Sequence, residues 1–204
     1  MAKILHRRIT FYFALGLAVL GVNITVSSYH ILRLIHNNSL VTHSQTVIIT
    51  LERMLSTLKD AETGQRGYLL TGAPSYLAPY NSAIARIHQR VQELQTLTSD
   101  NQNQQQRLQT LQPLVDAKLA ELNQTIQLQQ SGRRAAAEQV VRSDRGKRIM
   151  DQIRALVTQM QQEEEALLEL RSQQSRNSIR QTTLALSLIS VLTLLLLLSI
   201  YALI

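Results

Sequence analysis

The residues of this sequence best suited to binding a charged ligand are an acidic and a basic side chain four positions apart, Glu62 and Arg66. In a helix, an acidic residue four positions before a basic one shares its face and favours an ion pair. Three tyrosines gather around the turn that follows: Tyr68, Tyr76 and Tyr80. One interpretation is a ligand pocket lined by the pair and the tyrosines. The other, which we favour, is an ion pair with aromatic caps that lock the turn.

Two glycines lie within the same stretch, three positions apart, at Gly64 and Gly67. Each should cost the interior of a helix about 1 kcal/mol relative to alanine. Glycines at such positions usually allow a neighbouring backbone or side chain to come close. We therefore expect another segment of the chain to pack against this face.

A second concentration of charge lies between residues 133 and 154, where seven basic residues accompany three acidic ones. Its centre is a candidate basic patch made of Arg142, Arg145 and Lys147. A positive cluster can attract an anionic ligand or an anionic surface. The alternative, which we favour, is a solvated face whose charges balance the acids of neighbouring helices.

Metal and enzyme chemistry have little support in the sequence. His36 and His43 share a helical face, but seven residues of helix separate them by roughly 10 Å, too far for one metal ion. We find no nucleophile paired with a base, no phosphate-binding loop and no pair of catalytic carboxylates. We therefore predict a non-catalytic chain with no metal and no cofactor.

The elements that position these residues begin and end with apolar segments. Residues 9–29 and 182–204 form two segments without charge, each about as long as a membrane-spanning helix. Lys3, Arg7 and Arg8 precede the first, so residues 1–8 are expected in the cytoplasm of a bacterial inner membrane. The competing interpretation is a cleaved signal peptide ending near residues 26–28. We favour the uncleaved anchor because helical periodicity continues past that point.

Residues 30–181 are then expected outside the cytoplasm, which excludes a nucleic-acid partner. Apolar residues recur there at intervals of three and four in four stretches, a pattern typical of amphipathic helices. Turn signals separate the stretches at 71–75, 99–101 and 131–132, with Ser75 as an expected N-cap. The sequence thus predicts an all-α fold, an antiparallel four-helix bundle whose first and last helices continue into the two membrane helices.

Helix length predicts where the candidate clusters meet. Gly64 lies 35 residues beyond Tyr29, and Lys147 lies 36 residues before Thr183, both roughly 50 Å along a helix. Both should therefore lie at the membrane-distal end. The second helix is too short to reach back to the bilayer, so the first and last helices continue as a two-helix stalk. Such a stalk buries little apolar surface, and we expect a homodimer to complete it.

The stretch from 60 to 80 resembles the signature of the CHASE3 family of extracytoplasmic sensor domains. The matching residues are Glu62, Thr63, Gly64, Arg66, Gly67, Tyr68, Leu69, Thr71, Gly72, Tyr76 and Tyr80. Residues 144–147, 150–151 and 164–171 are also similar to the family pattern. The resemblance covers about residues 37–175. It implies a domain held between two membrane helices at the N-terminus of a signalling protein, most often a histidine kinase.

The resemblance implies an input module of two-component type, which passes a shift through the second membrane helix. The signal is an unidentified small molecule or protein. One alternative is a structural, dimerising membrane anchor. Another is a stand-alone regulator that pairs with full-length receptors, because no kinase or cyclase region follows residue 204 in this sequence.

Overall fold

A computed structural model describes residues 2–203, and all the regular elements in this range are helical. The elements, in chain order, are α1 (Ala2–Thr71), the 3-10 turn η1 (Pro74–Tyr76), α2 (Leu77–Leu97), α3 (Gln102–Gln130), α4 (Arg134–Arg142) and α5 (Arg145–Leu203). Two of these helices are very long, with 70 residues in α1 and 59 in α5. Both pass without a break from the amphipathic stretches into the apolar segments, as the sequence predicted.

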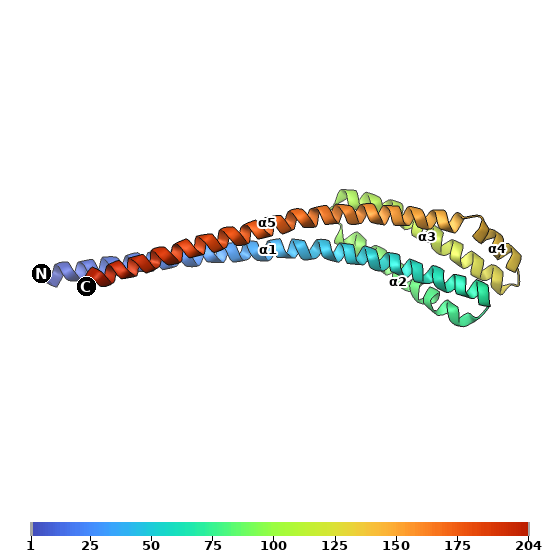
Figure 1. Cartoon of the computed structure of the whole chain (residues 1–204), viewed down its shortest axis with the longest axis horizontal. Helices are drawn as coiled ribbons and strands as arrows, with labels where there is room; N and C mark the ends of the chain where they lie inside the picture. Colours follow the sequence, from blue (N-terminus) through green and yellow to red (C-terminus); the bar gives the residue numbers. More distant parts are fainter. Residues whose placement is uncertain (1, 204) are drawn as a thin grey trace. The chain divides into compact units, whose positions relative to one another are not determined.

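The chain divides into two compact units. The first contains residues 43–167, and the second contains the residues up to Thr42 together with those from Leu168 onward. The first unit is an antiparallel bundle of α2, α3 and the adjoining parts of α1 and α5, with the short α4 beside α3 (Figure 1). The predicted all-α four-helix bundle is therefore confirmed.

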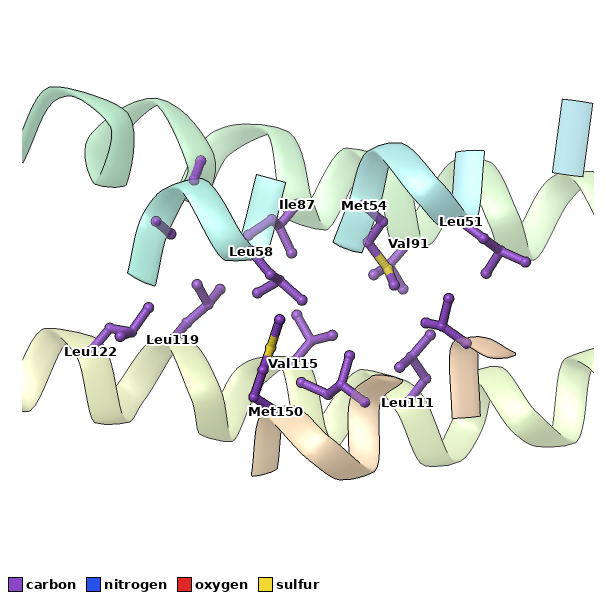
Figure 2. Packing of buried hydrophobic residues seen from close by; sticks show 14 of the residues in the cluster. Leu51, Met54, Leu58, Ile87, Val91, Leu111, Val115, Leu119, Leu122 and Met150 are labelled. Carbon is purple, nitrogen blue, oxygen red and sulfur yellow. The ribbon is translucent and has the colours of Figure 1, made fainter. Parts of the chain in front are cut away.

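The core of the bundle follows a regular repeat on each long helix. On α3 one stripe of buried positions runs through 104, 108, 111, 115, 118, 122 and 125, at alternating intervals of four and three. Leu119, Glu121 and Ile126, beside this stripe, are buried as well. The same alternation appears on α1 from 44 to 68 and on α5 from 146 to 164. Figure 2 shows side chains of α1, α2, α3 and α5 meeting in this core, among them Leu58, Ile87, Val115 and Met150. Such intervals are typical of helices that pack knobs into holes.

Polar residues occupy the repeat at both ends of the bundle. At one end, Ser44, Gln104 and Glu164 are buried, and their side chains are joined by hydrogen bonds. At the other end, Gln65 donates a hydrogen bond of 2.6 Å to Thr125, and both side chains are buried. The apolar layers lie between these polar layers. Because a buried polar group must find a partner, such layers fix which residues lie opposite one another.

Two local expectations are corrected by the structure. Ser75 is not an N-cap, because it lies within η1 and α2 begins after Tyr76 without a side-chain cap. The apolar spacing of the sequence predicts Ile149 and Leu156 in the core-facing stripe of α5, but they are only partly buried against the core, whereas their neighbours Met150 and Val157 are fully buried. Both choices fit a helical period, and only the packing partners decide between them.

The second unit is a pair of helices formed by the start of α1 and the end of α5. Thr182 Oγ1 lies 3.0 Å from His30 Nδ1, and Asn37 donates a hydrogen bond of 3.2 Å to Ser178. Arg171 donates to the carbonyl oxygen of Leu40. Residue numbers rise along one helix as they fall along the other, so the pair is antiparallel.

Candidate functional site

The last turns of α1 present two faces with different roles. One face contains Gly64 and Gly67 and packs against the segment that contains η1. A Cβ atom at Gly64 would lie 2.6 Å from the carbonyl oxygen of Tyr76, and one at Gly67 would meet the ring of the same residue. The two glycines are therefore required for close approach, as their spacing predicted.

The tyrosines of the signature belong to this packed face. Tyr68 and Tyr80 are buried, and burial raises the pKa of the Tyr80 hydroxyl. Tyr76 is half exposed and covers Gly67. The α1 helix ends at Thr71 and is followed by Gly72, whose φ of +71° is a conformation that favours glycine. This arrangement locks the turn between α1 and α2.

The other face of α1 contains the predicted ion pair. Arg66 Nη2 lies 2.6 Å from Glu62 Oε1, and the Arg66 side chain is 66% exposed against 13% for Glu62. The second oxygen of Glu62 lies 3.8 Å from Lys118 Nζ on α3. Thr63 is exposed and belongs to neither face. The signature thus contributes to packing on one side and to a charged cluster on the other.

The charged cluster contains a buried lysine. Lys118 is only 2% exposed, and its ammonium donates a hydrogen bond of 3.0 Å to Glu121, which is also buried. A buried charge is costly unless paired, so Glu121 and Glu62 together stabilise the ammonium. One network therefore joins two carboxylates and one ammonium, and it links α1 to α3.

Gly146 leaves room for the Glu121 carboxylate because it has no side chain. A Cβ atom at Gly146 would lie 2.5 Å from Glu121 Oε2. Gly146 is the second residue of α5, so the carboxylate lies at a helix N-terminus, where the backbone carries partial positive charge. Any other residue at 146 would push the carboxylate away from this position.

A cleft of about 450 Å³ opens above this network, between the end of α1 and the α3, α4 and α5 helices. Its floor consists of Glu62, Lys118 and Glu121. Its exposed rim contains Arg66, Arg134, Glu138, Asp144 and Lys147, and its apolar wall contains Leu69, Leu70, Ala137 and Val141. The cleft thus brings together the two charged regions that the sequence placed at one end of the bundle. The tyrosines of the signature do not line it.

The candidate basic patch is dispersed over the surface. Arg142 pairs with Glu138 at 2.7 Å, and its side chain is 77% exposed. Lys147 pairs with Asp151 at 3.0 Å, and this hydrogen bond, with the charges of Lys147 and Arg154, lowers the pKa of the Asp151 carboxyl. Arg145 is exposed and lies outside the cleft lining. Of the three patch residues, only Lys147 lines the cleft.

Three residues of this site were not predicted from the sequence: Lys118, Glu121 and Gly146. Lys118 could have been found from the repeat, because it occupies a core position between Val115 and Leu122. A charged residue at such a position marks either a break in the repeat or a buried pair. Glu121 and Gly146 gave no comparable signal, because their roles depend on contact between α3 and α5.

A second polar cluster lies at the opposite end of the bundle, where the turn between α2 and α3 meets α5. Asn101 caps α3 by accepting from the backbone of Gln104, and it also donates to Glu163 at 3.0 Å. Arg107 forms an ion pair with the same carboxylate. Burial alone would raise the pKa of Glu163, but hydrogen bonds from Asn101 and Arg107 hold it below the usual value. This cluster fastens the turn to α5.

Comparisons with known proteins place these features in context. The CHASE3 domain family matches residues 37–174, a range that includes every residue of the cleft. Among solved structures, the chain is similar to the crystal structure of the Rhodopseudomonas palustris histidine kinase HK9 sensor domain, with 25% sequence identity and a TM-score of 0.57. That similarity covers 62% of this chain and 98% of the other. A comparison with curated proteins gives no match.

Proposed function

Because the chain belongs to the CHASE3 domain family, we propose that it is the extracytoplasmic input module of a membrane-anchored receptor of the histidine kinase type. Its role as a sensor domain follows from the family and from the similarity to a histidine kinase sensor domain. The anchoring, the orientation and the mechanism of transmission are the proposed parts.

The observation that carries the proposal is the continuity of α1 and α5. Glu62 on α1 and Lys147 on α5 both line the cleft, and each helix continues without a break into an apolar segment. A helix is stiff along its axis because every turn is hydrogen-bonded to the next. A change at the cleft can therefore move α5 relative to α1 over its whole length. Small sliding or rotation of helices is a common form of such a signal.

Anchoring in a membrane is supported by the surface of the apolar segments. Both helices contain a stretch long and apolar enough to cross a bilayer. Large side chains such as Phe13, Leu17, Leu188 and Leu194 are more than half exposed. Exposure of so much apolar surface to water would be unfavourable, whereas the hydrocarbon of a lipid bilayer would cover it. The basic residues before the first segment support a cytoplasmic N-terminus.

A homodimer is supported by the two-helix unit. Four apolar side chains outside the proposed spans are about half exposed or more: Ile31, Leu32, Ile35 and Ile179. A pair of helices covers only part of each apolar face. A second copy related by a twofold axis would cover these residues with the same residues of its partner.

The proposal is tested by fusing the whole chain, at Ile204, to the kinase region of a histidine kinase that lacks its own sensor. One to seven residues are inserted at the junction, and autophosphorylation is measured in membranes. If α5 transmits the signal, kinase output should rise and fall with a period of about 3.6 residues. Equal output from all insertions would show that α5 does not transmit. Alkaline phosphatase fused after Gln130, active only outside the cytoplasm, tests the orientation separately.

The structural alternative makes a different prediction for the same fusion. If the chain is only a dimerising anchor, Glu62→Ala and Arg66→Ala should lower thermal stability and leave kinase output unchanged at temperatures where the fusion is folded. If the cleft is part of the input, the same variants should shift the output at those temperatures. Thr63→Ala is the matched control, because Thr63 is an exposed neighbour outside the cleft.

A further inference from the structure

The cleft at the end of the bundle has an uneven distribution of charge. Its floor holds two carboxylates, of Glu62 and Glu121, for the single ammonium of Lys118. Its rim holds three basic residues, Arg66, Arg134 and Lys147, for two acidic ones, Glu138 and Asp144. Arg66 pairs with Glu62 of the floor, and Lys147 pairs with Asp151 outside the lining. The lining of the cleft is thus neutral as a whole, with two buried or half-buried carboxylates at the floor and its exposed basic side chains at the rim.

This polarity selects among ligands by their charge. A simple anion would meet repulsion at the floor, and a simple cation would meet it at the rim. Because the floor is nearly dry, with side-chain exposures of 2% for Lys118 and 5% for Glu121, its charges are weakly screened. A small molecule with a cationic group at one end and an anionic group at the other fits both regions.

A buried amide at the cleft provides an independent observation. The side-chain oxygen of Gln129 is buried and has no hydrogen-bond partner within the described part of the chain. Gln129 lines the cleft. Buried acceptors normally receive a hydrogen bond. Rotation of this amide toward the cleft would let a ligand with N–H donors satisfy its oxygen.

We propose that the cleft binds a free α-amino acid or a peptide of two residues. The ammonium group points to the carboxylates of Glu62 and Glu121, and the carboxylate points to Arg134 and Lys147 at the rim. A short apolar side chain contacts the wall made of Leu69, Leu70, Ala137 and Val141. The volume of about 450 Å³ is within the usual range for small-molecule sites and suits a ligand of this size. The inference deepens the proposed sensor function by naming the ligand class of its cleft.

Binding is measured directly on the full chain in lipid nanodiscs. The common L-amino acids and a set of dipeptides are first screened for a rise in the thermal unfolding temperature. Isothermal titration calorimetry then gives the affinity of each compound that raises it. We expect at least one compound to bind with one site per chain and a Kd of about 1 mM or tighter. If no compound binds, the inference is wrong.

The two charges of the ligand are tested with two derivatives of the best compound. The N-acetyl form lacks the cation, and the amide form lacks the anion. Each should bind at least about tenfold more weakly, which corresponds to about 1.4 kcal/mol. A derivative that binds as tightly as its parent would show that the cleft does not require both charges, and would overturn the assignment.

Matched variants locate the site. Arg134→Gln and Glu62→Gln should each weaken binding at least about tenfold. Arg133→Gln is the control, because Arg133 precedes Arg134 in the chain, contacts Ser131 and lies outside the cleft. Equal binding by Arg134→Gln and the parent would place the ligand elsewhere.

Failure of the inference and failure of the proposed function have separate signatures. In one case the chain binds an amino acid, but the output of the kinase fusion does not change with helix register. This result would overturn the sensor mechanism and leave the cleft assignment intact. In the other case the output of the fusion depends on register, but the chain binds no compound of the panel. This result would overturn the cleft assignment and leave the sensor mechanism intact.

Discussion

The ammonium of Lys118 is buried in the bundle and would be costly without its partners. Its two carboxylate neighbours come from different helices, so the network stabilises both the charge and the contact between α1 and α3. Removing one member of a buried pair leaves the other charge without compensation, which usually costs about 3–5 kcal/mol. Lys118 is therefore both part of the cleft and a condition for the fold around it.

We predict that Lys118→Met lowers the free energy of unfolding by about 3 kcal/mol, because Glu121 loses its buried partner. The double variant Lys118→Met with Glu121→Gln should lose less than the single one. Lys59→Met is the control, since Lys59 is exposed on α1. Urea unfolding followed by tyrosine fluorescence measures the change, because the chain has no tryptophan. A cost no larger than that of the control would contradict a paired, buried lysine.

Gly64 and Thr63 form a matched pair for testing the packed face. Alanine normally stabilises a helix relative to glycine by about 1 kcal/mol. At Gly64 the added methyl would meet the backbone oxygen of Tyr76, so we expect Gly64→Ala to lower stability by about 1–3 kcal/mol instead. Thr63→Ala, on exposed helix, should change it little. The two thermal unfolding curves decide, and a more stable Gly64→Ala variant would show that the turn can move away.

At the scale of the elements, the turn between α2 and α3 depends on one carboxylate of α5. Glu163 is held by Asn101 and Arg107, which come from the cap and the first turns of α3. Its pKa in the folded chain is below the ordinary value of about 4.3. The contribution of the cluster is thus fully present above that ordinary value, and it is lost as pH falls through the lower, folded value.

We therefore predict a pH-dependent effect of Glu163→Gln. The gap in unfolding free energy between the parent and this variant should be widest near neutral pH and should narrow below about pH 4. Glu165→Gln, an exposed neighbour on the same helix, should show no such gap. Urea unfolding at a series of pH values measures both. A gap that stays constant with pH would mean that the charge of Glu163 contributes nothing.

The helices themselves were largely predictable from the sequence. Gly72, Asn101 and Gly132 act locally, through a turn or a cap, and the helix ends lie within a few residues of them. The choice of Met150 over Ile149 for the core was not predictable, because both lie on adjacent helical positions. That choice depends on how α5 is rotated against α1 and α3, which no local pattern encodes.

The candidate site was predictable only in part, for the same physical reason. The Glu62–Arg66 pair follows from spacing within one helix, and the structure contains it. The contact of Glu121 with Gly146 joins residues of two helices, and charge spacing along one helix cannot reveal it. The separation of the signature into a packed face and a cleft face likewise became visible only with α2 and α3 in place.

At the scale of the whole molecule, the proposed dimer can be tested without altering a native cysteine, because the chain has none. Single cysteines placed in turn at residues 31–36 should cross-link two copies in membranes at some positions, with the spacing of one helical face. Asn123→Cys, exposed on α3, is the control for random collision. If no position between 31 and 36 cross-links above that control, the two-helix unit is not the dimer contact.

Under the proposed mechanism, the polar ends of the repeat limit how far α5 can slide. A slip by one turn, about 5.4 Å, would carry Glu164 to the level of Met160 among apolar side chains and drive Met150 into the space beside Glu121 that Gly146 leaves open. Glu164 and Gly146 thus oppose a full-turn slip of α5 in that direction, so the proposed signal would be a movement of less than one turn. A cysteine pair at Asn37 and Ser178 should accordingly form a disulfide, and one at Asn37 and Thr182, a turn away, should not.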